Sequence, residues 1–263
     1  MRYVRISFSI LFIKIKLYIY INMKSISLFI IISSICVILF GLIYIFAYKK
    51  QRETYTGLED LHSKLKLDFG TFKDEYPEQL MAFKYLKGPE KVLEIGGNIG
   101  RNTLIIASIL DNQKNLVSLE SDTDISKQLE HNKQLNNMSF LIENAALSTK
   151  KLIQKGWDTI PSDVVLDGYK SVNTITYSEL LKKYNIEFDT LILDCEGAFY
   201  YILQDMPEVL NNINLIIMEN DYHDINNKNY IDEVLKKSGF SVIHSEAGGW
   251  GPCSNNFFEV WQK

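Results

Sequence analysis

Short apolar runs and longer amphipathic segments alternate along most of the chain, and this alternation predicts the fold. The apolar runs have the length of buried strands and are bounded by polar residues or glycine; they cover 92–95, 115–119, 138–143, 189–194 and 214–219. Between them, apolar positions recur at helical spacing, as in 102–110 and 124–136. Strands that alternate with helices are typical of an α/β domain with a mostly parallel sheet. Two closing runs, 240–244 and 256–262, predict a terminal antiparallel hairpin.

Two further segments are placed by the same pattern. Residues 72–86 carry apolar side chains at helical spacing, which predicts a helix leading into the first strand; such a helix either packs on the sheet or covers a ligand. Residues 150–173 contain several turn-forming residues, and they form either a hairpin excursion or a substrate loop. Trp157 in that segment is either a packing anchor or a surface on which a sugar ring stacks.

The first 70 residues differ from the rest in composition. Residues 26–48 contain no charged side chain and are longer than the roughly 20 residues that span a bilayer, which predicts a retained transmembrane helix rather than a cleaved signal peptide. An N-terminal extension (1–25) precedes this span, and a polar linker (49–70) joins it to a globular domain (71–263). The pattern predicts a single-pass membrane protein.

The start and the orientation of the predicted span stay open. Met1 and Met23 are both candidate starts, so that residues 1–22 are either an upstream extension or a second hydrophobic segment. Basic residues flank the span on both sides, and the number before it depends on whether Met1 or Met23 is the start. The positive-inside rule therefore does not fix the orientation. The cysteine usage and the cytosolic origin of the expected cofactor favour a globular domain on the cytoplasmic side.

Charge and cysteine content narrow the function classes. The 263 residues carry a net charge of −4, which argues against a nucleic-acid partner, because phosphate binding usually needs a basic face. The three cysteines show neither a disulfide framework nor zinc-ligand spacing, which favours a reducing compartment for the globular part.

A glycine-rich turn after the first strand organises the predicted site. The strand carries Glu94, and the turn contains Gly96 and Gly100 before a helix begins. Strand, glycine turn and helix together open a nucleotide-binding α/β fold, in which Gly96 permits a tight turn and close approach of a ligand. The spacing is not that of the dinucleotide fingerprint, and Glu94 would repel a pyrophosphate. A carboxylate suits a cationic ligand such as the ammonium end of S-adenosylmethionine; the alternative is an ordinary strand–helix connection.

Polar residues at the ends of the next two strands fit a nucleoside. Glu120 follows the second strand at about 20 residues from the glycine turn, where a carboxylate accepts hydrogen bonds from ribose hydroxyls. Asn144 follows the third strand, and its amide can meet an adenine edge with both donor and acceptor. The alternatives are a solvated strand-end acid for Glu120 and a turn residue for Asn144.

Candidate bases follow the fourth and fifth strands. Asp194 and Glu196 come at the carboxyl edge of the sheet, where open α/β sheets bind ligands. Alternate residues of an extended segment point the same way, so we expect the two carboxylates to share a pocket and to raise one pKa. His223, after Glu219, is a second candidate base or a loop histidine without a catalytic role. Asp194, Glu196 and Glu219 also offer oxygen ligands for magnesium, although their spacing does not establish a metal site.

Taken together, segments between residues 90 and 245 resemble the FkbM family of methyltransferases in order and spacing. The segments are Leu93–Gly100 with Thr103, Leu119–Glu120, Asn144–Ser148, Thr174–Thr176 with Glu179–Leu180, Asp189–Ala198 and Leu215–Glu219. Two positions depart from the family pattern. Gly97 stands where alanine is common, and Phe199 stands where a polar residue often follows Gly-Ala.

The resemblance implies a class I methyltransferase fold, with a Rossmann-like sheet that is mostly parallel and has an antiparallel last strand, here behind the predicted transmembrane helix. It implies S-adenosylmethionine as cofactor and, usually, O-methylation of sugars, glycolipids or natural-product hydroxyls. The residues that it places at the cofactor are Glu94, Gly96, Gly97, Asn98, Gly100, Thr103, Glu120, Asn144, Ala145 and Asp194.

We therefore expect a membrane-anchored O-methyltransferase that acts on a sugar hydroxyl of a glycan or glycolipid, with Asp194, Glu196 and His223 as candidate catalytic residues. Two other classes stay open. One is a non-catalytic membrane-anchored protein that retains a cofactor-binding domain. The other is a nicotinamide oxidoreductase. The absence of the G-x-G-x-x-G fingerprint of dinucleotide-binding proteins argues against it.

Overall fold

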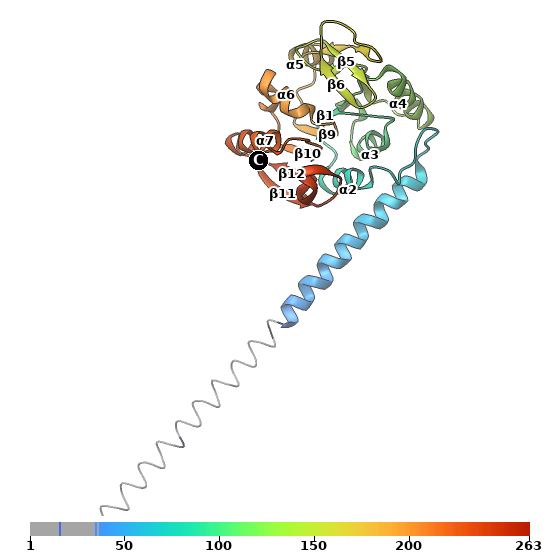
Figure 1. Ribbon diagram of the computed structural model, residues 1–263. Helices are drawn as coiled ribbons and strands as arrows, with labels where there is room; N and C mark the ends of the chain where they lie inside the picture. Colours follow the sequence, from blue (N-terminus) through green and yellow to red (C-terminus); the bar gives the residue numbers. More distant parts are fainter. Residues whose placement is uncertain (1–15, 17–34, 36) are drawn as a thin grey trace, which may run out of the picture. The chain divides into compact units, whose positions relative to one another are not determined.

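The computed structural model describes residues 16, 35 and 37–263 (Figure 1). The chain divides into two units, Met1–Glu53 and Thr54–Lys263. Residues 37–64 are helical, so helical structure extends through most of the predicted linker. Residues 1–15 and 17–25 of the predicted extension lie outside the described residues.

The predicted transmembrane helix is not supported. Among the described residues, no helix combines the length and the apolar character that crossing a bilayer requires. The prediction of a single-pass membrane protein is contradicted by this finding, and the membrane helix over 26–48 has no support among the described residues. Residues 26–34 and 36 of that segment lie outside the described part.

The second unit is built on a seven-stranded sheet with the order β11-β12-β10-β9-β1-β2-β3. The strands are β1 (Val92–Ile95), β2 (Leu116–Leu119), β3 (Leu141–Glu143), β9 (Thr190–Leu193), β10 (Leu215–Glu219), β11 (Ser241–Glu246) and β12 (Phe258–Gln262). β12 is antiparallel to both of its neighbours, and the other strand pairs are parallel. This confirms the prediction of a mostly parallel sheet with an antiparallel last strand.

The strand order reverses between β1 and β9. From β1 the chain builds outward to β2 and β3, and it then returns to add β9 and β10 on the other side of β1. In open α/β sheets, a ligand crevice forms beyond the carboxyl ends of the strands at such a switch point. The turns that follow β1 and β9 are therefore the place to look for a site.

Helices cover both faces of the sheet (Figure 1). They are α2 (Tyr76–Tyr85), α3 (Arg101–Ile109), α4 (Thr123–Leu135), α5 (Tyr177–Tyr184), α6 (Ala198–Asp205) and α7 (Ile225–Lys237), with 3₁₀ turns at Gln113–Asn115, Pro207–Leu210 and Gly251–Asn256. Because side chains alternate along a strand, Leu191 and Leu193 of β9 join the core with α5, α6 and α7, whereas Ile192 joins the core with α2, α3 and α4. The strands thus hold two apolar layers, and their carboxyl ends stay free for a site.

Residues 150–173 form a separate antiparallel sheet with the order β6-β5-β7, made of β5 (Leu152–Lys155), β6 (Asp158–Pro161) and β7 (Lys170–Val172). Just outside it, β4 (Ala146–Leu147) and β8 (Thr174–Ile175) pair in parallel. The Ala146 N–H donates to the Asn173 carbonyl at 2.8 Å, which brings the two ends of the excursion together. Of the two alternatives for this segment, the hairpin excursion is confirmed.

Helix α5 illustrates how closely local sequence fixes an element. Thr176 caps the helix: its hydroxyl accepts from the Glu179 N–H at 3.3 Å, while the Glu179 carboxylate accepts from the Thr176 N–H at 2.9 Å. This reciprocal capping box satisfies two N–H groups that the helix itself leaves free. Helix α2 begins only at Tyr76, four residues later than predicted, because Glu75 before it has a left-handed backbone and Pro77 occupies its first turn.

Candidate active site

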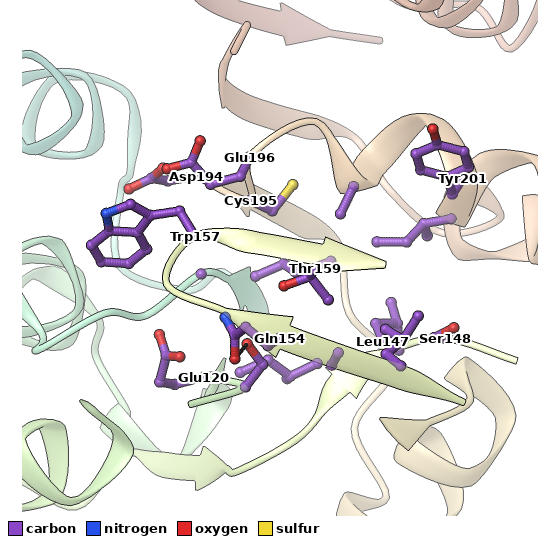
Figure 2. A pocket seen from close by; sticks show the side chains of 18 of the residues that line it. Glu120, Leu147, Ser148, Gln154, Trp157, Thr159, Asp194, Cys195, Glu196 and Tyr201 are labelled. Carbon is purple, nitrogen blue, oxygen red and sulfur yellow. Dashed lines mark hydrogen bonds between the residues drawn. The ribbon is translucent and has the colours of Figure 1, made fainter. Parts of the chain in front are cut away.

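A cavity of about 580 Å³ opens at the carboxyl edge of the sheet, at the switch point between β1 and β9 (Figure 2). Its floor contains strand-end residues: Gly96 after β1, Glu120 after β2, Asp194 after β9 and Glu219 at the end of β10. Strands β5 and β6 line the opposite side, and the start of α2 forms a wall. The site is thus assembled from three separate parts of the chain.

Gly96 lies where two turns touch. A Cβ atom at this position would lie 1.6 Å from the Asp194 carbonyl oxygen, and the φ angle of +94° is one that side-chain-bearing residues rarely adopt. The N–H groups of Gly96 and Gly97 both donate to the Leu119 carbonyl, at 3.0 and 2.9 Å. The glycine is therefore required first by the close packing of the β1 turn against the β9 turn, and it also lines the cavity.

Glu94 lies beneath the turn and does not line the cavity. Its carboxylate accepts hydrogen bonds from the hydroxyls of Thr103 on α3, at 2.7 Å, and Ser118 on β2, at 2.5 Å. Burial raises the pKa of Glu94 to about 7, although these two bonds oppose the shift. The acid that was expected to meet a cationic ligand is thus used to hold the strand, the turn and the helix together.

The neighbouring motif residues act in the same supporting way. A Cβ at Gly97 would lie 2.1 Å from the Ser118 hydroxyl, and one at Gly100 would lie 2.6 Å from a Leu129 methyl group on α4. Thr103 is fully buried beside Glu94. None of these three lines the cavity. They shape the turn so that Gly96 and Asn98 reach the cavity.

Glu120 lines the cavity and is fixed by backbone donors. Its two carboxylate oxygens accept from the N–H groups of Asn98 and Asp122, each at 2.8 Å. Burial raises the pKa of Glu120, and these N–H groups lower it in part. A carboxylate oxygen has more than one lone pair, so the held carboxylate can still accept bonds from a ligand's hydroxyls. This is the geometry that a ribose-binding acid needs.

Asn144 is occupied elsewhere. Its amide donates to the Glu120 carbonyl at 2.8 Å and accepts from the Thr123 hydroxyl at 3.0 Å, which ties the end of β3 to the β2 turn. It lies outside the cavity lining, whereas its neighbour Ala145 is part of it. At the end of β3, the expected adenine contact can therefore come from Ala145, which lines the cavity, and not from the Asn144 amide.

A group of carboxyl side chains lines one part of the cavity. Asp194 and Glu219 from the sheet are joined there by Glu78 from the first turn of α2. Burial, followed by the charges of Glu75 and Glu78, raises the pKa of Asp194 well above its usual range. Burial and then the charge of Asp194 likewise raise the pKa of Glu219. Asp194 therefore holds a proton more tightly than an ordinary aspartate does.

Glu196 lines the cavity beside Asp194, as predicted for alternate residues, but its backbone is unusual. It has a φ angle of +50°, and the next residue, Gly197, donates its N–H to the buried Asp221 carboxylate at 2.8 Å. Burial raises the pKa of Glu196, and the nearby His223 lowers it. Non-glycine residues with positive φ gather at functional sites, where surrounding contacts hold them.

His223 does not line the cavity. Its exposed ring packs against Trp250 at a centroid distance of 4.4 Å. Phe199 is also not part of the substrate side, because it is 1% exposed and belongs to the core. Of the three candidate catalytic residues, the structure brings Asp194 and Glu196 together in the cavity and leaves His223 outside it.

We call the part of the lining formed by β5, β6 and the turn between them the roof of the cavity. The sequence analysis singled out only some of the side chains in and around the roof. Trp157, at the turn between β5 and β6, lines the cavity and is 60% exposed, which excludes a role as packing anchor (Figure 2). At another part of the lining, Lys150 pairs with Asp205 at 2.8 Å near Tyr201. Gln154 of β5 accepts from the Ser121 hydroxyl at 3.3 Å, which connects roof and floor.

The charge of the lining is strongly one-sided. Among the described residues that line the cavity, Lys150 is the one basic side chain, whereas seven are acidic: Glu75, Glu78, Glu120, Asp194, Glu196, Asp205 and Glu219. Such a surface favours a cationic ligand and opposes phosphate. Within the described part of the chain, no group of three or more His, Cys, Asp or Glu side chains is arranged to hold a metal ion.

Comparison with known proteins adds similarity in fold. No family model matches the chain, and no curated protein matches it. Similar solved structures include a ribosomal protein L11 methylase from Lactobacillus delbrueckii subsp. bulgaricus (11% identity, TM-score 0.46, 75% of this chain and 81% of that one). Others are an O-methyltransferase from Bacillus cereus in complex with SAH (14%, 0.45, 80% and 91%) and a tRNA (m1A58) methyltransferase from Aquifex aeolicus (12%, 0.43, 78% and 74%).

The strand order and the antiparallel last strand give this chain an α/β Rossmann-like methyltransferase fold. The resemblance to the FkbM family in particular stays a prediction, because no family model matches. The expectation that nucleic acid is not a partner also stays a prediction.

Proposed function

We propose that the protein is an S-adenosylmethionine-dependent O-methyltransferase of the FkbM type, and that its acceptor is a sugar hydroxyl of an uncharged glycan. The observation that carries the proposal is the cavity at the switch point, where Gly96, Glu120 and Asp194 meet in a lining with seven acids and one lysine. That charge distinguishes between cofactors, because a nicotinamide dinucleotide brings a pyrophosphate, whereas S-adenosylmethionine brings a sulfonium and an ammonium group.

The chain's residues fit the parts of this cofactor. Glu120, held by two backbone N–H groups, accepts from the ribose hydroxyls, and Ala145 lies where the base would pass the end of β3. When bound, the cofactor supplies an electrophilic methyl group on a positively charged sulfur. The negative charges of the acids attract the positively charged sulfur and thereby favour binding of the sulfonium form.

Asp194 is proposed as the general base. The acceptor hydroxyl attacks the methyl carbon in line with the leaving sulfur, the carbon–sulfur bond electrons stay on sulfur, and the hydroxyl proton passes to the Asp194 carboxylate. The position of Asp194 in the cavity supports this role, and its raised pKa makes its carboxylate a stronger proton acceptor than an ordinary aspartate. Glu196 lies beside it and is proposed to orient the acceptor.

The roof supports a glycan acceptor. Trp157 offers an exposed indole face at the cavity, and such a face packs on the apolar face of a sugar ring. The acidic lining opposes phosphate-bearing acceptors, which supports an uncharged one. The alternative is a non-catalytic protein that binds the cofactor. The observation in its favour is that His223, a candidate catalytic residue, lies outside the cavity.

Calorimetry on the full chain tests the cofactor. We expect S-adenosylmethionine to bind at micromolar concentration, NADH not to bind, and Glu120→Gln to weaken binding by about tenfold or more, because a charge-assisted hydrogen bond is lost. Glu208→Gln, an exposed change outside the cavity, is the matched control. Binding of NADH, or of neither compound, would overturn the proposal.

Turnover then separates the enzyme from a cofactor-binding protein. Formation of S-adenosylhomocysteine is followed by mass spectrometry with a panel of neutral oligosaccharides and their phosphorylated counterparts. We expect turnover with neutral members and little with phosphorylated ones. Cofactor binding without turnover on any member would favour the non-catalytic alternative.

A further inference from the structure

Glu78 is a buried acid that the strand-end rule does not predict. It lies in the first turn of α2, is only 7% exposed, and lines the cavity. Its Oε2 atom is buried without any hydrogen-bond partner among the described residues. A buried carboxylate oxygen without a donor is costly, so a native protein that keeps one has a use for it.

The surroundings of Glu78 supply carboxyl groups and no cation. Glu219 at the end of β10 and Asp194 after β9 line the same cavity as Glu78, and the charge of Glu78 contributes to the raised pKa of Glu219. Two basic side chains that pair with acids of the cavity lining are engaged away from Glu78. Arg101 pairs with Glu75 and lies outside the lining, and Lys150 pairs with Asp205 at 2.8 Å.

The chemistry of this group favours an ammonium ion. Glu78 from α2 and Glu219 from β10 line the same cavity, and an ammonium ion has three N–H donors that such carboxyl oxygens can accept. A magnesium ion instead requires oxygens at about 2.0–2.1 Å in octahedral geometry. No described group of three such side chains meets the requirements of a metal site.

We propose that Glu78, together with Glu219, binds the α-ammonium group of the amino-acid portion of S-adenosylmethionine. This inference rests on the proposed function, because it assigns the position of one end of that cofactor. It transfers to Glu78 the role that the sequence pattern gives to Glu94, which lies buried under the turn. Helix α2 thereby becomes part of the cofactor site, although it precedes the first strand of the sheet.

Two ligands that differ in the amino-acid portion test the inference on the full chain. S-adenosylhomocysteine has the ammonium group, whereas 5′-methylthioadenosine keeps the adenosine and the thioether and lacks the amino acid. We expect Glu78→Gln to weaken binding of S-adenosylhomocysteine by about tenfold or more, since a charge-assisted contact is lost. Binding of 5′-methylthioadenosine should change less than about twofold, and retained binding also shows that the variant is folded.

Controls separate this inference from the proposed function. Glu219→Gln should give the same selective loss, and the exposed Glu208→Gln should change neither affinity. Equal weakening of both ligands by Glu78→Gln, or unchanged binding of S-adenosylhomocysteine, would overturn the assignment while leaving a cofactor site in place. If the wild-type chain binds neither ligand, the proposed function fails, and this inference fails with it.

Discussion

Gly96 and Asp194 touch through the backbone: a Cβ atom on Gly96 would lie 1.6 Å from the Asp194 carbonyl oxygen. The glycine turn after β1 and the acidic turn after β9 are therefore packed against each other, and neither can move alone. The residue proposed as the base is thus positioned by the residue at the centre of the cofactor turn.

Gly96→Ala tests this packing. We expect it to lower the free energy of unfolding by at least about 3 kcal/mol, because alanine disfavours the φ angle of +94° and its methyl group overlaps backbone atoms that cannot rotate away. Chemical denaturation of the full chain measures the loss. Gly156→Ala is the control, since its φ is also positive while no atom lies within 4 Å of its Cβ position. Equal losses in the two variants would show that contact with Asp194 is unimportant.

Gly97 and Ser118 should be coupled. A methyl group at Gly97 would lie 2.1 Å from the Ser118 hydroxyl. Because Gly97 does not have a positive φ, this contact, and not backbone strain, is what would make alanine unfavourable there. We expect Gly97→Ala to cost about 1–3 kcal/mol, and Ser118→Ala to cost about 1–2 kcal/mol through the lost bond to Glu94.

The double variant gives the decisive comparison. Because Ser118→Ala removes the atom that Gly97→Ala would meet, the double variant should lose less stability than the two costs added together, by about 1 kcal/mol or more. Additive costs in a denaturation series would refute the coupling. The result bears on the FkbM resemblance, since alanine is common at this position in that family and here requires a change at Ser118.

Glu94 should make stability depend on pH. Its pKa is raised from 4.5 to about 7 in the folded protein, so between these values the folded protein holds a proton that the unfolded chain has lost. The free energy of unfolding therefore falls as pH rises from 4.5 through 7, by about 3 kcal/mol from this one group. In Glu94→Gln this part of the slope should disappear, while the amide oxygen can still accept from Thr103 and Ser118.

Thermal or chemical unfolding across pH 4.5–8 measures this slope, with the exposed Glu208→Gln as control. The difference between Glu94→Gln and wild type should be small at the acid end and should favour the variant at pH 8. Parallel curves for the two proteins would mean that Glu94 titrates alike in the folded and the unfolded states.

Asp194→Ala tests the proposed base. We expect formation of S-adenosylhomocysteine with an accepted glycan to fall by about 100-fold or more, because general-base catalysis contributes about that much. Binding of S-adenosylhomocysteine should weaken far less, by about tenfold, since Glu78 and Glu219 remain. Turnover that stays unchanged would exclude Asp194 as the base, and Glu196 would then be the residue to change next.

The sheet and the floor of the site could be predicted because they follow from local pattern and from one topological rule. Apolar runs marked the strands, and parallel strands bring their carboxyl ends to one edge, so Gly96, Glu120 and Asp194 were expected to meet there. Side-chain roles were harder to predict. Glu94 and Asn144 have suitable chemistry, but the sequence does not show that neighbouring hydroxyls and carbonyls already occupy them.

The wall and the roof could not be predicted from the strands. Glu78 lies in a helix that precedes the sheet, and an acid in a first helical turn is common for reasons of helix stability alone. Trp157 was left between two roles until its 60% exposure excluded packing. The expected membrane span rested on hydrophobic composition alone, and no described helix has the length and apolar character of a span.

The β6-β5-β7 sheet leaves and rejoins the body of the domain at one point, where the Ala146 N–H meets the Asn173 carbonyl at 2.8 Å. An insertion whose two ends already touch can change in length or sequence without pulling on the strands beneath it. The floor and the roof of the cavity are therefore separable units of inheritance. Under the proposed function, a related chain could exchange this one segment and thereby acquire a new acceptor while keeping the same methyl donor.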